Sequence, residues 1–146
     1  MKAVIQRVNS ASVEVENKLI SKIEKGLLIL LGFKEGDTHK ESEYLIKKIT
    51  NLRIFPDEKH PINKSASGLD LEILVVSQFT LYGDCKKGNR PSFIGAMPPE
   101  QAKAFYNDFV EKFRQQYPKV QDGVFGAHMK INLINDGPVT IVLDSP

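Results

Sequence analysis

The stretch LVVSQFTLYGD, residues 74–84, places two polar residues within an apolar run. Its first three residues are typical of a buried strand, and Ser77 and Gln78 interrupt that strand before Phe79. Polar residues at such a point could be a nucleophile at a strand end, a β-bulge, or a turn without chemistry. No G-x-S-x-G motif surrounds Ser77, so the nucleophile turn of the α/β-hydrolases is excluded.

Two further stretches combine residue types that bind or turn. KKGNRPSF is a basic turn before an aromatic residue, and its three cations are Lys86, Lys87 and Arg90. A solvated loop would explain it without any function. NDGPV, residues 135–139, contains Asp136-Gly137, a strong signal for a two-residue hairpin turn. Spacing alone does not choose between function and these structural interpretations.

Other catalytic and metal-binding patterns are missing from the chain. There is no Walker A loop and no G-x-G-x-x-G motif. The three histidines, His39, His60 and His128, lie far apart in the sequence, and no H-x-x-x-H or C-x-x-C pair exists. Among them, only His128, at a strand start, is a candidate to line a site. We therefore expect no metal and no other cofactor.

Composition indicates one globular domain over residues 1–146, with 41% hydrophobic and 26% charged residues. The net charge of +2 is too small to indicate nucleic-acid binding by itself. The single cysteine, Cys85, suits a reducing compartment and is expected to have no role. The longest apolar run, Leu27–Leu31, is too short to span a membrane, and the first residues do not form a signal peptide. These features predict a soluble cytoplasmic protein.

The elements that must position these residues are mixed. Short Val- and Ile-rich runs predict strands at residues 2–8, 11–16, 18–24, 26–33 and 74–76, and a final pair at 129–134 and 139–143. A capping box of Thr38 and Glu41 predicts the start of one helix, and Pro98-Pro99 predicts the start of another. Ala102, Phe105, Phe109 and Phe113 are expected to form the apolar stripe of the second helix. This order favours an α+β fold with mostly antiparallel pairing.

Several stretches together resemble the D-aminoacyl-tRNA deacylases, the D-tyrosyl-tRNA deacylase family. They are MKAVIQRV, GLLILLGF, NLRIF, VVSQFTL, RPSF, FGAHM and NDGPVT, and they span the whole chain in the family's order. SQFTL and NDGPVT together are the most specific. One departure is His128, where the family commonly has an acidic residue.

The resemblance implies a barrel-like sheet with two main helices and a homodimer with its active site at the subunit interface. It implies catalytic roles for Ser77, Gln78, Phe79 and Thr80, and substrate contacts for Gly137, Pro138, Arg7 and Met129. In the family the Gly-Pro bond is cis and faces the other protomer's pocket. The implied substrates are tRNA carrying a D-amino acid or glycine, including tRNA-Ala mischarged with glycine, while L-aminoacyl-tRNA is rejected.

Backbone N–H groups near Phe79 and Thr80 could stabilise the oxyanion of ester hydrolysis if the strand opens at Ser77-Gln78. The resemblance implies that the substrate's own 2′-OH assists; a Thr80 nucleophile is the rival mechanism. Arg7 is expected to bind carbonyls of the Gly-Pro turn, and Lys86, Lys87 and Arg90 are candidate tRNA contacts. Two other classes stay open: a small-ester hydrolase using Ser77 or Thr80, and a dimeric nucleic-acid-binding protein without catalysis.

Overall fold

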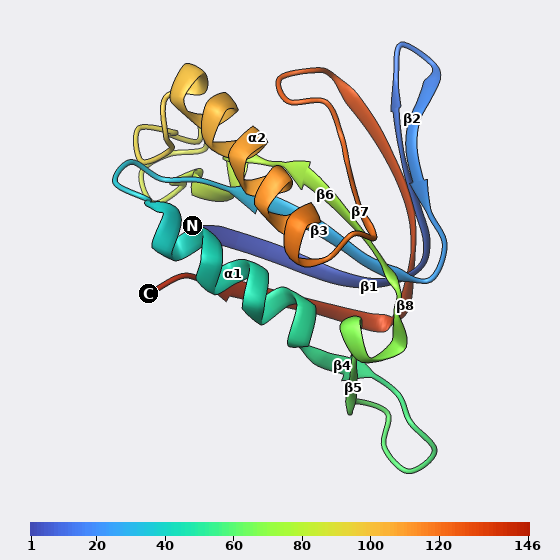
Figure 1. The fold of residues 1–146 in the computed structure, drawn as a ribbon. Coiled ribbons are helices and arrows are strands. Elements are labelled where there is room, and N and C mark those ends of the chain that lie inside the picture. Colours follow the sequence, from blue (N-terminus) through green and yellow to red (C-terminus); the bar gives the residue numbers. More distant parts are fainter.

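The computed structural model describes all 146 residues, as two α-helices and a strongly curved sheet (Figure 1). The helices are α1 (His39–Asn51) and α2 (Pro99–Gln116). The strands are β1 (Lys2–Val15), β2 (Lys18–Ile23), β3 (Gly26–Gly32), β4 (Arg53–Phe55), β5 (Lys64–Ser65), β6 (Glu72–Ser77), β7 (Val120–Asp122) and β8 (Met129–Asp144). Short 3₁₀ helices cover Ser67–Leu69 and Phe79–Tyr82.

The long strand β1 organises the sheet. It pairs antiparallel with β8 along its whole length, with β3 along its first half and with β2 along its second half. β3 then pairs in parallel with β6, and β6 in parallel with β7. The predicted α+β fold with a mostly antiparallel, barrel-like sheet and two helices is confirmed, although these two parallel pairings were not predicted.

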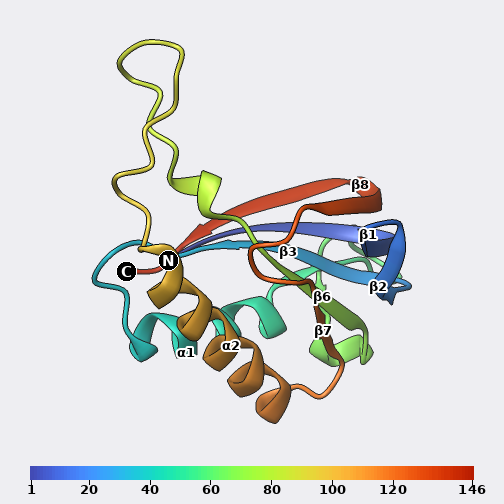
Figure 2. The same cartoon turned by 90° about the horizontal axis from the view of Figure 1, so that it is seen from above.

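Both faces of the central strands are buried, which explains why β3 shows no polar alternation. Odd-numbered residues such as Leu27, Ile29 and Val75 belong to the main core of 22 residues, together with buried residues of both helices. Even-numbered residues such as Leu28 and Val76 belong to a second core of seven residues on the opposite face. Both helices therefore cover one face of the sheet (Figure 2).

The helices begin where the sequence predicts. Thr38 and Glu41 form the capping box, and Pro99 is the first residue of α2, where the missing N–H costs no hydrogen bond. The predicted stripe of α2 needs one correction. Tyr106 is buried, whereas Phe105 is only partly buried and packs its ring against Phe33 at 5.2 Å. Neither helix is long and apolar enough to cross a membrane.

The predicted hairpin at Asp136-Gly137 is wrong. Residues on both sides of it pair with the same strand, since Asn135 lies opposite Val8 and Thr140 lies opposite Gln6. Residues 136–139 of β8 therefore lie opposite a single residue of β1, Arg7, and they bulge out of the sheet before β8 continues. β1 is likewise one continuous strand, where two strands were predicted at residues 2–8 and 11–16. A long partner strand thus overrides the local turn signal.

Candidate functional site

The SQF segment marks the end of β6. Ser77 is the last strand residue, and the Gln78 N–H still donates to the Leu31 carbonyl at 2.7 Å. The backbone then turns into the 3₁₀ helix Phe79–Tyr82. Because 3₁₀ hydrogen bonds join residues three apart, the N–H groups of Phe79 and Thr80 have no acceptor within that helix. The polar break therefore leaves main-chain donors at the strand end.

Gly32 lets this turn form close to β3. A Cβ atom at this position would lie 2.9 Å from the Gln78 carbonyl oxygen, which is closer than side chains pack. The absent side chain allows the chain after β6 to cross the end of β3. The GLLILLGF stretch therefore contributes to the shape of the site as well as to the core.

A cavity of about 620 Å³ opens beside this strand end. Most of its lining side chains are apolar, and several come from the SQF, RPSF and FGAHM stretches. The lining residues are Leu31, Phe33, Val76, Ser77, Gln78, Phe79, Phe93, Ala96, Met97, Pro98, Pro99, Ala102, Phe125, Gly126, Ala127, His128, Met129 and Ile131. His128 is the one ionisable residue among them, so the cavity contains no carboxylate and no amine.

Two phenylalanine rings form part of the cavity wall. Phe79 and Phe93 meet edge to face with their centroids 5.0 Å apart. Phe79 remains 56% exposed although it is a large apolar side chain. An exposed aromatic ring of this kind can contact a planar or apolar group of a ligand. The ligand-facing surface of this cavity is thus mainly hydrophobic.

The candidate nucleophiles have no general base beside them. Gln78 Nε2 donates to Thr80 Oγ1 at 2.5 Å, and no hydrogen bond joins Thr80 or Ser77 to a histidine or carboxylate. Thr80 is exposed and lies next to the cavity, but it is not among the residues that line it. The side-chain arrangement of Ser77 and Thr80 therefore lacks the base–nucleophile contact of covalent hydrolases.

Gly137 and Pro138 are exposed in the β8 bulge, and they do not line the cavity of their own chain. Their peptide bond is cis. The Asn135 side chain closes the bulge, because its amide accepts from the Val139 N–H at 2.8 Å and donates to the Val139 carbonyl at 3.2 Å. The bulge is therefore a defined structure that presents the Gly-Pro pair outward.

Arg7 holds the bulge from behind. Its side chain is buried and donates to the carbonyls of Asp136 at 2.8 Å and Ile54 at 2.7 Å, with a longer bond to Pro61 at 3.3 Å. Its Nε also lies 3.4 Å from the Asp136 carboxylate. The predicted contact with the turn is thus made to the carbonyl preceding Gly137; no hydrogen bond to the carbonyls of Gly137 or Pro138 is present.

The remaining histidines lie elsewhere. His39 pairs with Asp108 at 3.1 Å, and His60 lies 3.6 Å from Asp57 in the loop between β4 and β5. No group of three or more His, Cys, Asp or Glu side chains is placed to hold a metal ion. Cys85 is exposed on the basic loop with Lys86, Lys87 and Arg90.

Sequence reasoning missed part of the cavity wall. Met97, Pro98 and Pro99 line it, although the two prolines indicated only a helix start. The Met97 N–H donates to the Phe33 carbonyl at 3.0 Å and fixes this wall to the end of β3. Sequence reasoning also missed Tyr106, whose hydroxyl donates to the Val75 carbonyl at 2.9 Å beneath the site. Burial raises the pKa of Tyr106, so it stays a donor.

Comparison with known proteins decides the family. The sequence profile described as D-Tyr-tRNA(Tyr) deacylase matches residues 4–144. The chain belongs to this family. A protein of Thermosipho melanesiensis named D-aminoacyl-tRNA deacylase is 58% identical over 99% of this chain and 97% of its own length. Its namesake from Clostridium acetobutylicum is 52% identical, with the same shares covered. The enzyme class predicted from the sequence is thereby confirmed.

Solved structures give the same fold. A structure named "c-Myc DNA Unwinding Element Binding Protein" has a TM-score of 0.94 and 51% identity, and covers 100% of this chain and 99% of that one. Another, described as "Structural Analysis of a probable eukaryotic D-amino acid tRNA deacylase", has a TM-score of 0.86 and 17% identity, with 97% of each chain covered. At that identity the second likeness supports the fold alone. A chain of distant sequence therefore shares this architecture.

Proposed function

We propose that the protein hydrolyses the ester joining a D-amino acid to the 3′-terminal ribose of tRNA, in an active site that two copies of the chain complete. The observation that carries the proposal is the cavity at the end of β6. It combines free main-chain donors with a lining that has no carboxylate and no amine. This tRNA substrate also implies a location where aminoacylated tRNA is found, the cytoplasm.

The donors would stabilise the tetrahedral oxyanion. The N–H groups of Phe79 and Thr80 lie at the start of a helix, where backbone donors face outward. Each fixed donor of this kind contributes about 100- to 1000-fold in rate. An ester of a ribose hydroxyl has a neighbouring 2′-OH, which can take part in proton transfer. A site without a side-chain base beside Ser77 or Thr80 is consistent with such help from the substrate.

The second copy would supply the Gly-Pro bulge. In a single chain Gly137 and Pro138 face solvent, so another copy is needed to bring them to the cavity. β8 supports this assembly, since β1 is its sole partner strand and its surface exposes Ile134 (59%) and Val142 (61%). A long apolar edge strand is normally covered in a stable protein. A symmetric pair would cover both copies at once.

Backbone carbonyls of the bulge would then select chirality. A substrate α-carbon held against them has room for hydrogen on that side and not for an L side chain. A D side chain would point away, and glycine would also fit. Steric collision with backbone rejects a substrate more strongly than an apolar pocket, which discriminates only about 10- to 200-fold per methylene. Glycyl-tRNA is therefore a proposed second substrate.

The direct test compares D-tyrosyl-, L-tyrosyl- and glycyl-tRNA with wild type and Thr80→Ala. We expect hydrolysis of the D and glycyl esters, sparing of the L ester, and most activity retained by Thr80→Ala. A Thr80→Ala protein reduced to background would instead assign the nucleophile to Thr80. Wild type that leaves all three esters intact would overturn the deacylase proposal.

A complementation experiment tests the shared site. Ala127→Trp fills the cavity and Gly137→Ala disturbs the bulge, so each homodimer should be impaired. Random mixing makes half of the dimers mixed, and each mixed dimer carries one site built from two unmodified parts. About a quarter of wild-type activity should return. No recovery, with mixed dimers shown by mass spectrometry, would place the whole site within one chain.

One observation favours a second candidate. The structural neighbour at 51% identity is named for binding a DNA unwinding element. Binding without hydrolysis would match the nucleic-acid-binding alternative. Tight binding of a DNA duplex by this chain, together with no release of D-tyrosine from tRNA, would favour that function over the deacylase.

A further inference from the structure

A basic arm, residues 84–96, projects from the body (Figure 2). Backbone hydrogen bonds between Asp84 and Ser92, at 2.8 and 2.9 Å, make it a hairpin-like loop. At the C-terminal end of the arm, a β-bridge pairs Ala96 with Lys34 and attaches the arm to the body. All its residues from 84 to 95 are exposed, including Ile94 at 91%. A segment that buries so little does not serve the core.

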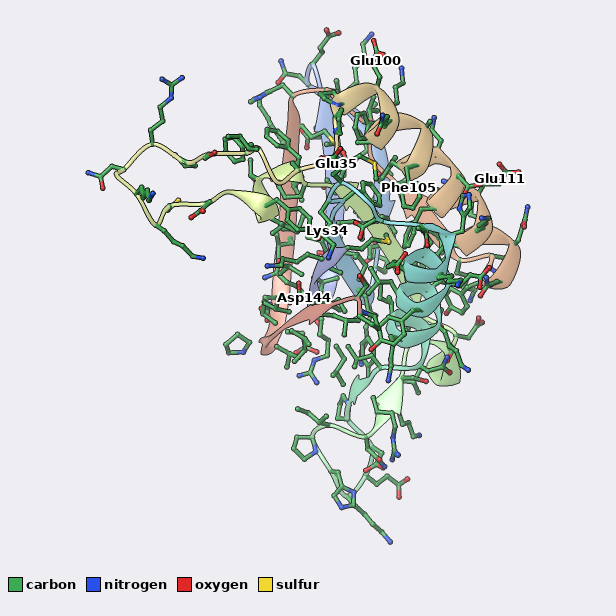
Figure 3. The ribbon with its side chains drawn as sticks, turned by 90° about the vertical axis from the view of Figure 1, so that its left-hand side faces the viewer. Lys34, Glu35, Glu100, Phe105, Glu111 and Asp144 are labelled. Carbon is green, nitrogen blue, oxygen red and sulfur yellow. The ribbon has the colours of Figure 1, made fainter.

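The arm concentrates the positive charge of the protein. Lys86, Lys87 and Arg90 are its cations, and Asp84 is its one anion. Its net charge of +2 equals that of the whole chain, so the other residues balance to zero. In the side-chain view, groups ending in nitrogen spread outward from the arm (Figure 3). The modest net charge of the sequence thus conceals one local basic surface.

The three cations are free to bind a ligand. None of the nine ion pairs of the structure involves them. The Asp84 carboxylate is occupied by the backbone N–H of Lys86, at 2.9 Å. Some other exposed cations are paired within the chain, such as Lys119 with Asp70 and Arg114 with Asp122. Unpaired cations on an exposed loop attract an anion from outside the chain.

The same arm forms part of the cavity wall. Phe93 and Ala96 of the arm line the cavity, and Arg90 precedes Phe93 by three residues. An extended chain of that length spans no more than about 11 Å. Cations this close to the cavity would contact the part of the substrate next to the ester that reacts in the cavity. For an aminoacylated tRNA, those groups are the phosphates of its single-stranded 3′ end.

We infer that the basic arm binds phosphates of the tRNA 3′ end while the cavity holds the aminoacylated terminus. The inference rests on the proposed deacylase function and adds a binding surface to it. In this arrangement the arm contributes to the binding of any tRNA, whereas the cavity carries out the hydrolysis. The arm should therefore affect KM for tRNA and leave kcat nearly unchanged.

The salt dependence of tRNA binding measures the contribution of the arm's phosphate contacts directly. Each phosphate contact to a single strand contributes about 0.7 to the slope of log affinity against log salt. Loss of all three cations should therefore reduce the slope for tRNA by about 2. For wild type, these contacts alone should weaken tRNA binding about 15- to 20-fold when salt rises fourfold. The variant Lys86→Gln/Lys87→Gln/Arg90→Gln removes the charge and keeps a polar, flexible side chain at each position.

The matched control removes three exposed cations elsewhere, in the variant Lys25→Gln/Lys40→Gln/Lys47→Gln. These side chains also form no ion pair and do not line the cavity. The control has the same net charge as the arm variant, so it isolates position from total charge. We expect it to retain the wild-type salt slope. A control that lost the slope equally would overturn the assignment to the arm.

Two substrates separate this inference from the deacylase proposal: D-tyrosyl-tRNA and the D-tyrosyl ester of adenosine, which has no phosphate. The arm variant should raise KM for the tRNA and hydrolyse the adenosine ester as wild type does. Wild type inactive on both substrates would refute the deacylase function itself. An unchanged KM and slope for tRNA, or an equal loss on both esters, would overturn the arm inference alone.

Discussion

Gly137 is a position where one added methyl group should lower both stability and deacylation. Its φ of +148° lies where side chains are rarely accommodated, and a Cβ atom there would lie 2.8 Å from the Val139 backbone nitrogen and 2.7 Å from Val139 Cγ2. The Val139 side chain can rotate away, but the nitrogen cannot, because Asn135 holds it at 2.8 Å. Gly137→Ala must therefore shift the bulge itself.

The destabilisation caused by Gly137→Ala has two parts. A left-handed backbone costs a residue with a side chain about 1–2 kcal/mol, and overpacking costs about 1–3 kcal/mol. The bulge is exposed and relaxes in part, so we expect a loss of about 2–4 kcal/mol in the free energy of unfolding. Deacylation of D-tyrosyl-tRNA should fall with it, since the displaced Gly-Pro carbonyls would no longer fit the second copy's cavity.

Two other glycines separate these contributions. Gly36 has a φ of +87° with nothing within 4 Å, so its replacement by Ala costs the backbone part only, about 1–2 kcal/mol. Gly95 has open space and an ordinary φ, so Gly95→Ala should be close to neutral. Urea unfolding of the three variants measures the differences. Gly137→Ala as stable as Gly95→Ala, with unchanged deacylation and L rejection, would refute the reasoning.

Three further variants test the network around the site. Arg7→Lys should lower stability by about 2–3 kcal/mol in urea unfolding, because one ammonium cannot reach its three carbonyl acceptors together, whereas a loss below 0.5 would contradict those contacts. Hydrogen bonds, first from the Asn63 side chain and then from two backbone N–H groups, lower the pKa of Asp57 to about 2. Its stabilising effect is therefore present above about pH 4 and lost as pH falls toward 2. Asp57→Asn should flatten that part of the stability–pH profile, and an unchanged profile would exclude the effect. Tyr106→Phe should cost only about 1 kcal/mol in thermal unfolding, because Gly123 N–H still donates to the Val75 carbonyl; a loss above 3 would show a larger role.

Local signals in the sequence predicted the elements whose causes are local. The capping box at Thr38 and the proline at the start of α2 act within a few residues, so their positions were found. The Asp136-Gly137 turn signal failed, because its outcome depends on β1, more than a hundred residues away. The hydrogen bonds that β1 offers on both sides of the bulge outweigh the tendency of two residues to reverse the chain.

The site was predictable to a similar extent. Ser77, Gln78, Phe79 and Met129 were singled out, and the cavity brings them together. The wall at 96–99 was not found, since proline residues and a methionine carry no chemical signal of their own. The role of Arg7 was partly anticipated from a charge on an apolar strand, but its bonds to Ile54 and Pro61 link segments that only the folded chain brings together.

The distribution of polar groups explains why the chain divides its site. The cavity is apolar and lacks a side-chain base, so it is suited to exclude water and to position main-chain donors. Arg7, the cation that contacts the Gly-Pro bulge, is buried and donates a hydrogen bond to the Asp136 carbonyl, so its side chain is not available to a substrate. Three cations without an ion pair, Lys86, Lys87 and Arg90, lie on the basic arm at the cavity's edge. Chemistry, chiral selection and tRNA affinity are thus proposed to depend on three separate segments, and variants in each should change kcat, the D-to-L ratio and KM respectively.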